Sequence, residues 1–190
     1  MKFPLILAST SVYRKSLLEK LGYPFRGIPP LVDENIMKGQ GKSPREIAEA
    51  LAKLKAMAVF KKHPQALVIG SDQVVSCEEK ILGKGGSFEA AFEQLQFISG
   101  KTHQLITSVC LIYPGGLEEF TEIVTLSMPE HSDEFLQAYL KKDAPYDCAG
   151  SYKIEENGMR LFNEIKCEDH SAIIGLPLLK THKALRRLLF

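Results

Sequence analysis

The strongest constraint on the fold is a short continuous apolar run, ALVIG at residues 66–70, which Ser71, Asp72 and Gln73 follow directly. An apolar run of this length is typical of a strand buried on both faces, and such strands occur in sheets that carry helices on each side. At the carboxyl end of a strand in an open α/β sheet, polar side chains face a crevice where ligands bind. The sequence therefore predicts a strand at 66–70 with Asp72 at its end, beside a site.

Hydrophobic periodicity and turn residues place the other elements. Ser43, Pro44 and Glu46 form the pattern of a helix N-terminus, with an N-cap residue, a proline in the first helical position and a capping box. Pro114 and Gly115 separate two extended stretches in the manner of a hairpin. The expected strands are 4–9, 103–113 and 117–128, and the expected helices are 13–21, 44–62, 87–98, 132–141 and 176–189. The pattern predicts a mixed α/β fold.

Composition and charge narrow the possible functions. The 45% of hydrophobic residues suffice for a sizeable core, and we expect residues 1–190 to form a single domain. Lys and Arg number 24 against 23 Asp and Glu, giving a formal net charge of +1, so no overall field attracts nucleic acid or a membrane. The basic residues of the last helix are expected to form a solvated face; they are Lys180, Lys183, Arg186 and Arg187.

Targeting signals and cysteines point to a cytoplasmic protein. Arg14 and Lys15 follow the first apolar run too early for a secretory signal peptide, and no apolar stretch has the length of a membrane span. The four cysteines are far apart and form no C-x-x-C pair. This spacing favours buried reduced thiols over disulfides or a zinc site.

Three hydroxyls and two cations gather where the first strand leads into the first helix, as Ser9, Thr10, Ser11, Arg14 and Lys15. The free N–H groups and the dipole of a helix start favour a phosphate there. The simpler interpretation is that one hydroxyl caps the helix while the other side chains are solvated. Taken alone, the pattern favours the simpler interpretation.

Acidic and basic side chains elsewhere could complete a phosphate site. Asp33 and Glu34 lie in an irregular loop and could hold Mg²⁺, although acidic loop pairs are common. Asp72 is either a functional carboxylate, serving a metal or a water, or a loop cap. Lys55 and Lys84 have two interpretations: they either neutralise the charge of a phosphate or are ordinary surface charges. Together these groups suit phosphoanhydride hydrolysis, and no glycine-rich Walker or dinucleotide motif is present.

Several motifs in chain order make the sequence resemble the Maf (septum-formation protein) family. The matches are Leu5–Ser11 with Arg14 and Lys15, Val32–Glu34, Lys55–Ala56, Gly70–Gln73, Gly83–Lys84 and Gly175–Leu178. The resemblance implies an α/β fold similar to inosine triphosphatase, with a mixed twisted sheet, flanking helices and two lobes around a central cleft. It also implies a homodimer.

The resemblance assigns roles to individual residues. Asp72 is expected to accept a proton from the water that attacks the α-phosphorus of a nucleoside triphosphate, so that pyrophosphate leaves. Mg²⁺ or Mn²⁺ would bind Glu34 and Asp72. The expected substrate-binding residues are Ser9, Ser11, Arg14, Lys15, Lys55 and Lys84.

Two segments resemble the subgroup that hydrolyses 7-methyl-GTP, namely Gly70–Gln73 and Cys148–Lys153. The specificity positions would then be Tyr13, Gln73 and Glu155. N7-methylation gives guanine a positive charge, which an aromatic face can stack on and a carboxylate can attract. The alternatives are a packing role for Tyr13 and a solvated charge for Glu155.

Three departures from the family pattern bear on rate and substrate. Gly85–Gly86 replaces a usual proline and is expected to make the Lys84 loop more mobile; residues 127–131 replace a Phe-Arg pair; and Ala172 stands where threonine is common. Two other functions stay open, a pyrophosphatase for TTP or UTP and a nucleotide-binding regulator of cell division without turnover. The near-neutral charge argues against nucleic-acid binding.

Overall fold

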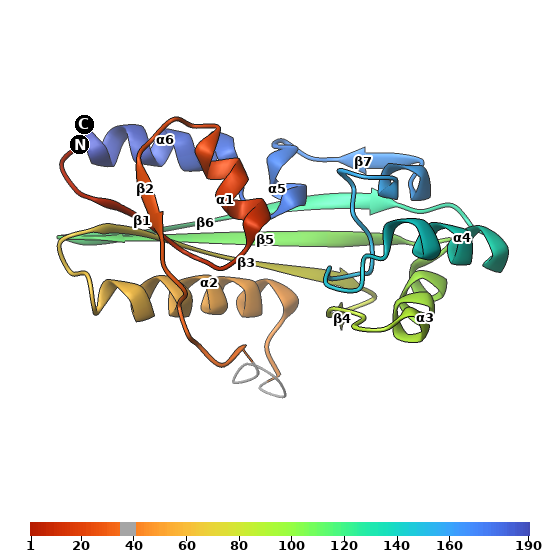
Figure 1. Cartoon of the computed structure of the whole chain (residues 1–190). Helices are drawn as coiled ribbons and strands as arrows, with labels where there is room; N and C mark the ends of the chain where they lie inside the picture. The colour runs from red at the N-terminus through yellow and green to blue at the C-terminus, as the bar shows by residue number, and fades with distance from the viewer. Residues whose placement is uncertain (35–40) are drawn as a thin grey trace. The chain divides into compact units, whose positions relative to one another are not determined.

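The computed structural model describes residues 1–34 and 41–190, and the chain divides into two compact units. The first unit contains Met1–Gln73, Thr107–Glu122 and Asp169–Phe190, and the second contains Val74–Ile106 and Ile123–Glu168. Strands and helices are interspersed along the chain (Figure 1). The α/β class is therefore confirmed, and the two units agree with the two lobes that the resemblance implies.

The strands form a mixed sheet of seven members. They are β1 (Leu5–Ala8), β2 (Phe25–Gly27), β3 (Leu67–Cys77), β4 (Lys80–Leu82), β5 (Thr102–Tyr113), β6 (Gly116–Ser127) and β7 (Glu164–Lys166). Their order is β2-β1-β3-β5-β6-β7, with β4 paired to β3. Strand β1 is parallel to both β2 and β3, whereas the β3–β4 and β6–β7 pairs are antiparallel. Strands β3, β5 and β6 each contribute residues to both units.

In the first unit, helices cover the sheet on both faces. Helix α2 (Pro44–Phe60) lies against one face, and α1 (Val12–Glu19) and α6 (Leu178–Leu189) lie against the other (Figure 1). Because successive side chains of a strand point to opposite faces, Leu67 and Ile69 join the core with α1 and α6, while Val68 joins the core with α2. The prediction that the apolar run is a strand buried on both faces is confirmed.

One boundary prediction was wrong, because β3 does not end after the apolar run. Ser71, Asp72 and Gln73 lie inside the strand, which continues to Cys77. The chain stays extended because the second half of β3 pairs with β4, with Val75 opposite Leu82. Asp72 therefore projects from the middle of a strand rather than from a loop.

The second unit holds two helices that pack against each other, α3 (Phe88–Ile98) and α4 (Asp133–Asp143). Ser87 and Ser132 cap their N-termini by accepting hydrogen bonds from backbone N–H groups. The same unit contains a 3-10 helix, η2 (Gly158–Leu161).

Most other predicted elements are confirmed within a few residues, and α2 begins with the expected capping box of Ser43 and Glu46. The short elements β2, β4, β7, η2 and α5 (Ser171–Ile174) were not predicted. Part of the irregular loop in which Asp33 and Glu34 were expected lies outside the described residues. Among the described residues, no helix combines the length and the apolar character needed to cross a membrane.

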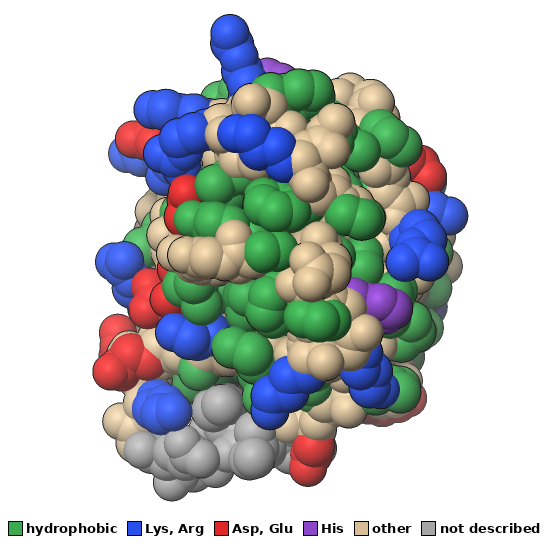
Figure 2. Space-filling model, turned by 90° about the vertical axis from the view of Figure 1, so that its left-hand side faces the viewer, with side chains coloured by type: hydrophobic (Ala, Val, Ile, Leu, Met, Phe, Trp, Pro, Cys, Tyr) green, Lys and Arg blue, Asp and Glu red, His purple; other side chains and the backbone are tan. Residues whose placement is uncertain are grey.

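Two expectations about individual side chains need correction. Lys180 of α6 is not simply solvated, because its Nζ lies 2.6 Å from the buried Glu122 carboxylate. All four cysteines are free thiols, but Cys148 and Cys167 are partly exposed rather than buried. On the face drawn in Figure 2, Asp and Glu side chains lie among the Lys and Arg side chains. That face accordingly lacks the uniform basic character of a nucleic-acid surface.

Candidate active site

The register of two parallel strands brings two polar segments of the first unit together. Ala8 of β1 pairs with Gly70 of β3. The next residues are Ser9, just after the end of β1, and Ser71, within β3, so the two serines follow paired residues of neighbouring strands. Helix α1 starts shortly after Ser9, so its first turn is next to the polar part of β3.

The hydroxyls at the start of α1 are used by the helix. Ser11 is the N-cap, and its Oγ accepts a hydrogen bond from Arg14 N at 3.3 Å. Ser9 Oγ accepts from Ser11 N at 3.1 Å. Lys15 is exposed and lies 3.9 Å from Glu19 on the surface of the helix. The capping role of one hydroxyl is confirmed for Ser11, but Ser9 and Arg14 are not simply solvated, because Ser9 accepts the hydrogen bond from Ser11 N and Arg14 donates one to the Gly175 carbonyl. Phosphate binding at this motif remains a prediction.

Arg14 is held against the turn that precedes α6. Its Nε donates to the Gly175 carbonyl at 3.0 Å, and Ser71 Oγ donates to the same oxygen at 3.0 Å. Burial lowers the pKa of the Arg14 guanidinium from its ordinary value, while the Asp72 and Glu34 carboxylates oppose that shift. The guanidinium thus lies in the field of both carboxylates.

Lys55 links the two carboxylates directly. Its Nζ lies 2.6 Å from Asp72 Oδ1 and 2.7 Å from Glu34 Oε1. Lys55 and Asp72 are 5% and 6% exposed, whereas the Glu34 side chain is 60% exposed. The site therefore runs from a buried ion pair to a carboxylate at the surface.

The carboxyl group of Asp72 has a perturbed proton affinity. Burial raises its pKa above the ordinary value of 3.8, and the positive charges of Lys55 and Arg14 partly offset this effect. A carboxylate with a raised pKa is a better proton acceptor near neutral pH than an exposed one.

The carboxylates of Glu34 and Asp72 lie close enough together to bind one divalent cation. Because both contact the same ammonium group, both are within reach of one cation. Within 1–34 and 41–190, no group of three or more His, Cys, Asp or Glu side chains could hold a metal. Mg²⁺ is commonly bound by one or two carboxylates together with substrate phosphates. The donor set fits such a substrate-completed site.

The two specificity candidates of the first unit differ in environment. Tyr13 is partly exposed in the first turn of α1. Gln73 Nε2 has three acceptors within 3.1 Å, namely Thr107 Oγ1 and the carbonyls of Ala172 and Ile173. The amide N–H groups of Gln73 are thus used inside the unit, and its Oε1 is the atom left for a ligand.

Lys84 and Glu155 belong to the second unit, and both are exposed. Lys84 forms an isolated β-bridge with Ala149, next to the hydrogen bond from Gly150 N to Gly83 O at 3.3 Å. Their participation in a site with residues of the first unit remains a prediction.

Comparison with known proteins identifies the family. The sequence matches the family described as Maf-like protein over residues 4–188. The chain belongs to this Maf family. Similar proteins include a 7-methyl-GTP pyrophosphatase of Bdellovibrio bacteriovorus, 45% identical over 182 residues and 95% of each chain. Another relative with that name, from Colwellia psychrerythraea, is 42% identical over 179 residues, covering 93% of this chain and 88% of its own. A third, from Bordetella pertussis, is 42% identical over 184 residues, covering 96% of this chain and 91% of its own.

The residues that depart from the usual Maf pattern have defined surroundings in the structure. A Cβ at Gly85 would lie 2.8 Å from Ser151 Oγ and 3.0 Å from Ala91 Cα, and Gly86 N donates to Tyr146 O at 2.9 Å. Gly85 therefore lies where a larger side chain would not fit, and the greater mobility of the Lys84 loop remains a prediction. The Ala172 side chain is fully buried and its carbonyl accepts hydrogen bonds from Gln73 and Thr107.

The segment 127–131 is also tied to its own unit. His131 stacks on Phe135 with ring centroids 4.5 Å apart, and its Nε2 contacts the Leu161 carbonyl at 3.0 Å. These contacts assign the histidine a packing role.

Sequence reasoning missed the backbone groups that orient the site. The Gly175 carbonyl positions Arg14 and Ser71, and Gly175 itself has a positive φ of 113° that favours glycine. Asp169 holds the following turn by accepting hydrogen bonds from Ser171 N at 3.0 Å and Leu179 N at 2.6 Å. The Gly-Leu-Pro-Leu pattern was the available signal, but it does not reveal which carbonyl faces Arg14.

Proposed function

We propose that this Maf protein hydrolyses 7-methyl-GTP to 7-methyl-GMP and pyrophosphate. The names of relatives that align over nearly the whole chain support the reaction and its substrate. The observation that carries the chemistry is the ion pair of Lys55 with the buried Asp72, with Glu34 on the same ammonium group.

In the proposed reaction, Asp72 accepts a proton from water while the water oxygen bonds to the α-phosphorus. The bond from the α-phosphorus to the bridging oxygen breaks, and pyrophosphate leaves with that oxygen. The raised pKa of Asp72 suits this step because a stronger base takes the proton more readily.

The cations of the site would stabilise the charge that develops on the phosphates. Arg14 and Lys55 are held by hydrogen bonds or ion pairs, so little reorganisation is needed when substrate binds. Lys15 and Lys84 are proposed to contact the outer phosphates, and Ser9 and Ser11 to shape the α1 N-terminus that faces them.

A divalent cation, Mg²⁺ or Mn²⁺, is proposed to bind Glu34 and Asp72, where it would polarise the phosphate oxygens and neutralise their charge. Lys55 would then share its two carboxylate partners with the metal.

Specificity is proposed to come from Tyr13, Gln73 and Glu155. The positive charge of 7-methylguanine would stack on the Tyr13 ring and attract the Glu155 carboxylate. Gln73 would present its Oε1 as an acceptor, because its N–H groups are bound to Thr107 and to main-chain carbonyls.

We further propose that residues 1–190 act as one functional domain, and that the protein is a cytoplasmic homodimer. Light scattering during size-exclusion chromatography would test the dimer. A mass near the 21.2 kDa of one chain would contradict it.

The substrate is tested by pyrophosphate release with Mg²⁺ over 7-methyl-GTP, GTP, UTP and TTP. We expect 7-methyl-GTP to have the highest kcat/KM. A preference for UTP or TTP would assign the chain to the other pyrophosphatase function, and tight binding without release would favour the regulator. Reaction in ¹⁸O-labelled water is expected to place the label in 7-methyl-GMP, whereas label in pyrophosphate would contradict attack at the α-phosphorus.

A further inference from the structure

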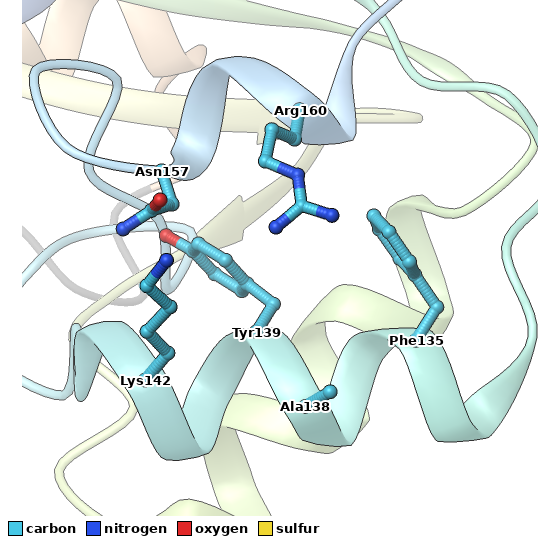
Figure 3. Close-up of a pocket in the computed structure, with 6 residues that line it drawn as sticks. All are labelled: Phe135, Ala138, Tyr139, Lys142, Asn157 and Arg160. Carbon is cyan, nitrogen blue, oxygen red and sulfur yellow. The ribbon is translucent and has the colours of Figure 1, made fainter.

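The second unit contains a cavity of about 140 Å³ between α4 and η2 (Figure 3). Its lining residues are Phe135, Ala138, Tyr139 and Lys142 of α4, Asn157, and Arg160 of η2. None of these residues belongs to the candidate active site, and all of them lie within one compact unit.

The charged lining of this cavity is entirely positive. Lys142 extends from α4 beside Asn157 and Tyr139, and Arg160 extends from η2 between Tyr139 and Phe135 (Figure 3). No Asp or Glu lines the cavity. The neighbouring Asp143 is already used, since its carboxylate accepts hydrogen bonds from Asn157 N at 2.9 Å and Asn157 Nδ2 at 2.7 Å. Among the described residues, neither cation forms an ion pair, so both charges are available to an anion.

Two aromatic rings, those of Phe135 and Tyr139, also line the cavity, together with Ala138 and Asn157. The Arg160 guanidinium carbon lies 5.6 Å from the centre of the Phe135 ring, which orients the guanidinium by a cation–π contact. Tyr139 is buried, and its hydroxyl accepts a hydrogen bond from Lys153 N at 3.0 Å, which fixes the ring. Two fixed rings beside two cations favour a ligand that is both planar and negatively charged.

We propose that this cavity binds a small aromatic anion, a single ring that carries one carboxylate or phosphate group. Its ring would lie against Phe135 and Tyr139, and its anionic group would lie between Lys142 and Arg160.

The size of the cavity limits the ligand. Its volume is close to that of cavities that take one benzene ring, at about 150 Å³, and well below the roughly 300–1,000 Å³ of sites for drug-sized ligands. A whole nucleotide is therefore too large to be enclosed by it. Lys142 lies in the last turn of α4, whose carbonyls disfavour an anion, so both cations are needed to make binding favourable.

The test uses the full-length protein labelled with ¹³C in its alanine methyl groups. The Ala138 methyl lines the cavity and reports binding there separately from any binding at the candidate active site. Benzoate and phenyl phosphate are titrated to about 10 mM, where millimolar affinity is measurable. Acetate supplies the charge without the ring, and benzyl alcohol supplies the ring without the charge.

We expect a saturable shift of the Ala138 signal with at least one aromatic anion, and about tenfold weaker binding of acetate and benzyl alcohol. Arg160→Gln and Lys142→Gln should each weaken binding about tenfold, because each removes a charge-assisted hydrogen bond. Lys141→Gln removes the same charge from the neighbouring exposed position outside the lining and should leave binding unchanged.

The proposal would be overturned by an Ala138 signal that does not shift with either aromatic anion. It would also be overturned if acetate or benzyl alcohol bound as tightly as the aromatic anion, or if Lys141→Gln weakened binding as much as the Arg160 and Lys142 substitutions do. Unchanged alanine signals elsewhere verify that each variant is folded. Because the readout is local to the second unit, its failure leaves the proposed hydrolysis untouched.

Discussion

Lys55 and Asp72 form a buried ion pair with 2.6 Å between Nζ and Oδ1, although they are 17 positions apart in the chain. One residue comes from α2 and the other from β3, so their contact depends on how closely the helix approaches the strand. Gly70 permits that approach, since a Cβ at this position would lie 2.2 Å from Ala52 O and 2.6 Å from Ala56 N.

Replacing Gly70 with alanine should therefore destabilise the first unit and separate the ion pair. We expect the free energy of unfolding in urea to fall by about 1–3 kcal/mol, the usual cost of overpacking a core. Gly83→Ala is the matched control, because a Cβ there meets nothing within 4 Å. An equal effect of the two substitutions would show that the close approach of α2 to β3 is unimportant.

The pH dependence of kcat/KM should have an acid limb that reports Asp72. The carboxylate must be deprotonated to accept a proton, so activity is lost as the pH falls through its pKa. Burial raises that pKa above 3.8, so we expect the midpoint of the limb to lie above this value. A rate that stays constant down to pH 3.8 would exclude Asp72 as the base.

Removing Lys55 should move the acid limb. The Lys55 charge opposes the rise of the Asp72 pKa, so Lys55→Gln should shift the midpoint of the limb to higher pH and lower the maximal kcat/KM by about 100-fold. Lys53→Gln, an exposed position on the same helix, provides the control. A lower rate with an unmoved limb would mean that Lys55 acts on the phosphates without tuning Asp72.

His103 should make the stability of the protein depend on pH. It is 2% exposed, and burial lowers its pKa from 6.5 to about 4. The unfolded chain binds a proton below pH 6.5 and the folded chain does not, so stability is lost as the pH falls from 6.5 toward 4. The loss attributable to this group reaches about 3 kcal/mol.

Urea unfolding at pH 7 and pH 4.5 would measure this contribution of His103. The parent should lose more stability than a His103→Phe variant, with His103→Gln as a second variant that keeps a hydrogen-bonding group for Tyr152. The exposed His170 serves as control. The His170→Gln variant should lose as much unfolding free energy between pH 7 and pH 4.5 as the parent does. Parallel losses in the parent and both His103 variants would contradict the prediction.

Local patterns predicted the elements that have strong local signals. The apolar run at 66–70 predicted a buried strand, because a strand that is covered on both faces has apolar side chains at successive positions. Ser43 and Glu46 predicted the start of a helix, because all residues of a capping box lie within four positions. Strands β2, β4 and β7 have three residues each, too few for a period to be visible. Their positions are set by pairing with other strands.

The site was predictable in its residue types but not in its contacts. The resemblance to Maf proteins named Arg14, Glu34, Lys55 and Asp72, and the structure brings Lys55 into contact with both carboxylates. The continuation of β3 through Asp72 depends on β4, and the orientation of Arg14 depends on the Gly175 carbonyl. Neither the strand pairing nor a backbone carbonyl leaves a mark in the side-chain pattern.

The most direct test compares the parent with Asp72→Asn, measuring pyrophosphate release from 7-methyl-GTP and, separately, nucleotide binding by calorimetry. The amide keeps the size of the side chain but cannot accept the proton from water. We predict that release falls by at least about 100-fold while the fold and much of the nucleotide affinity remain. Release at the parental rate would contradict the assignment of Asp72 as the proton acceptor.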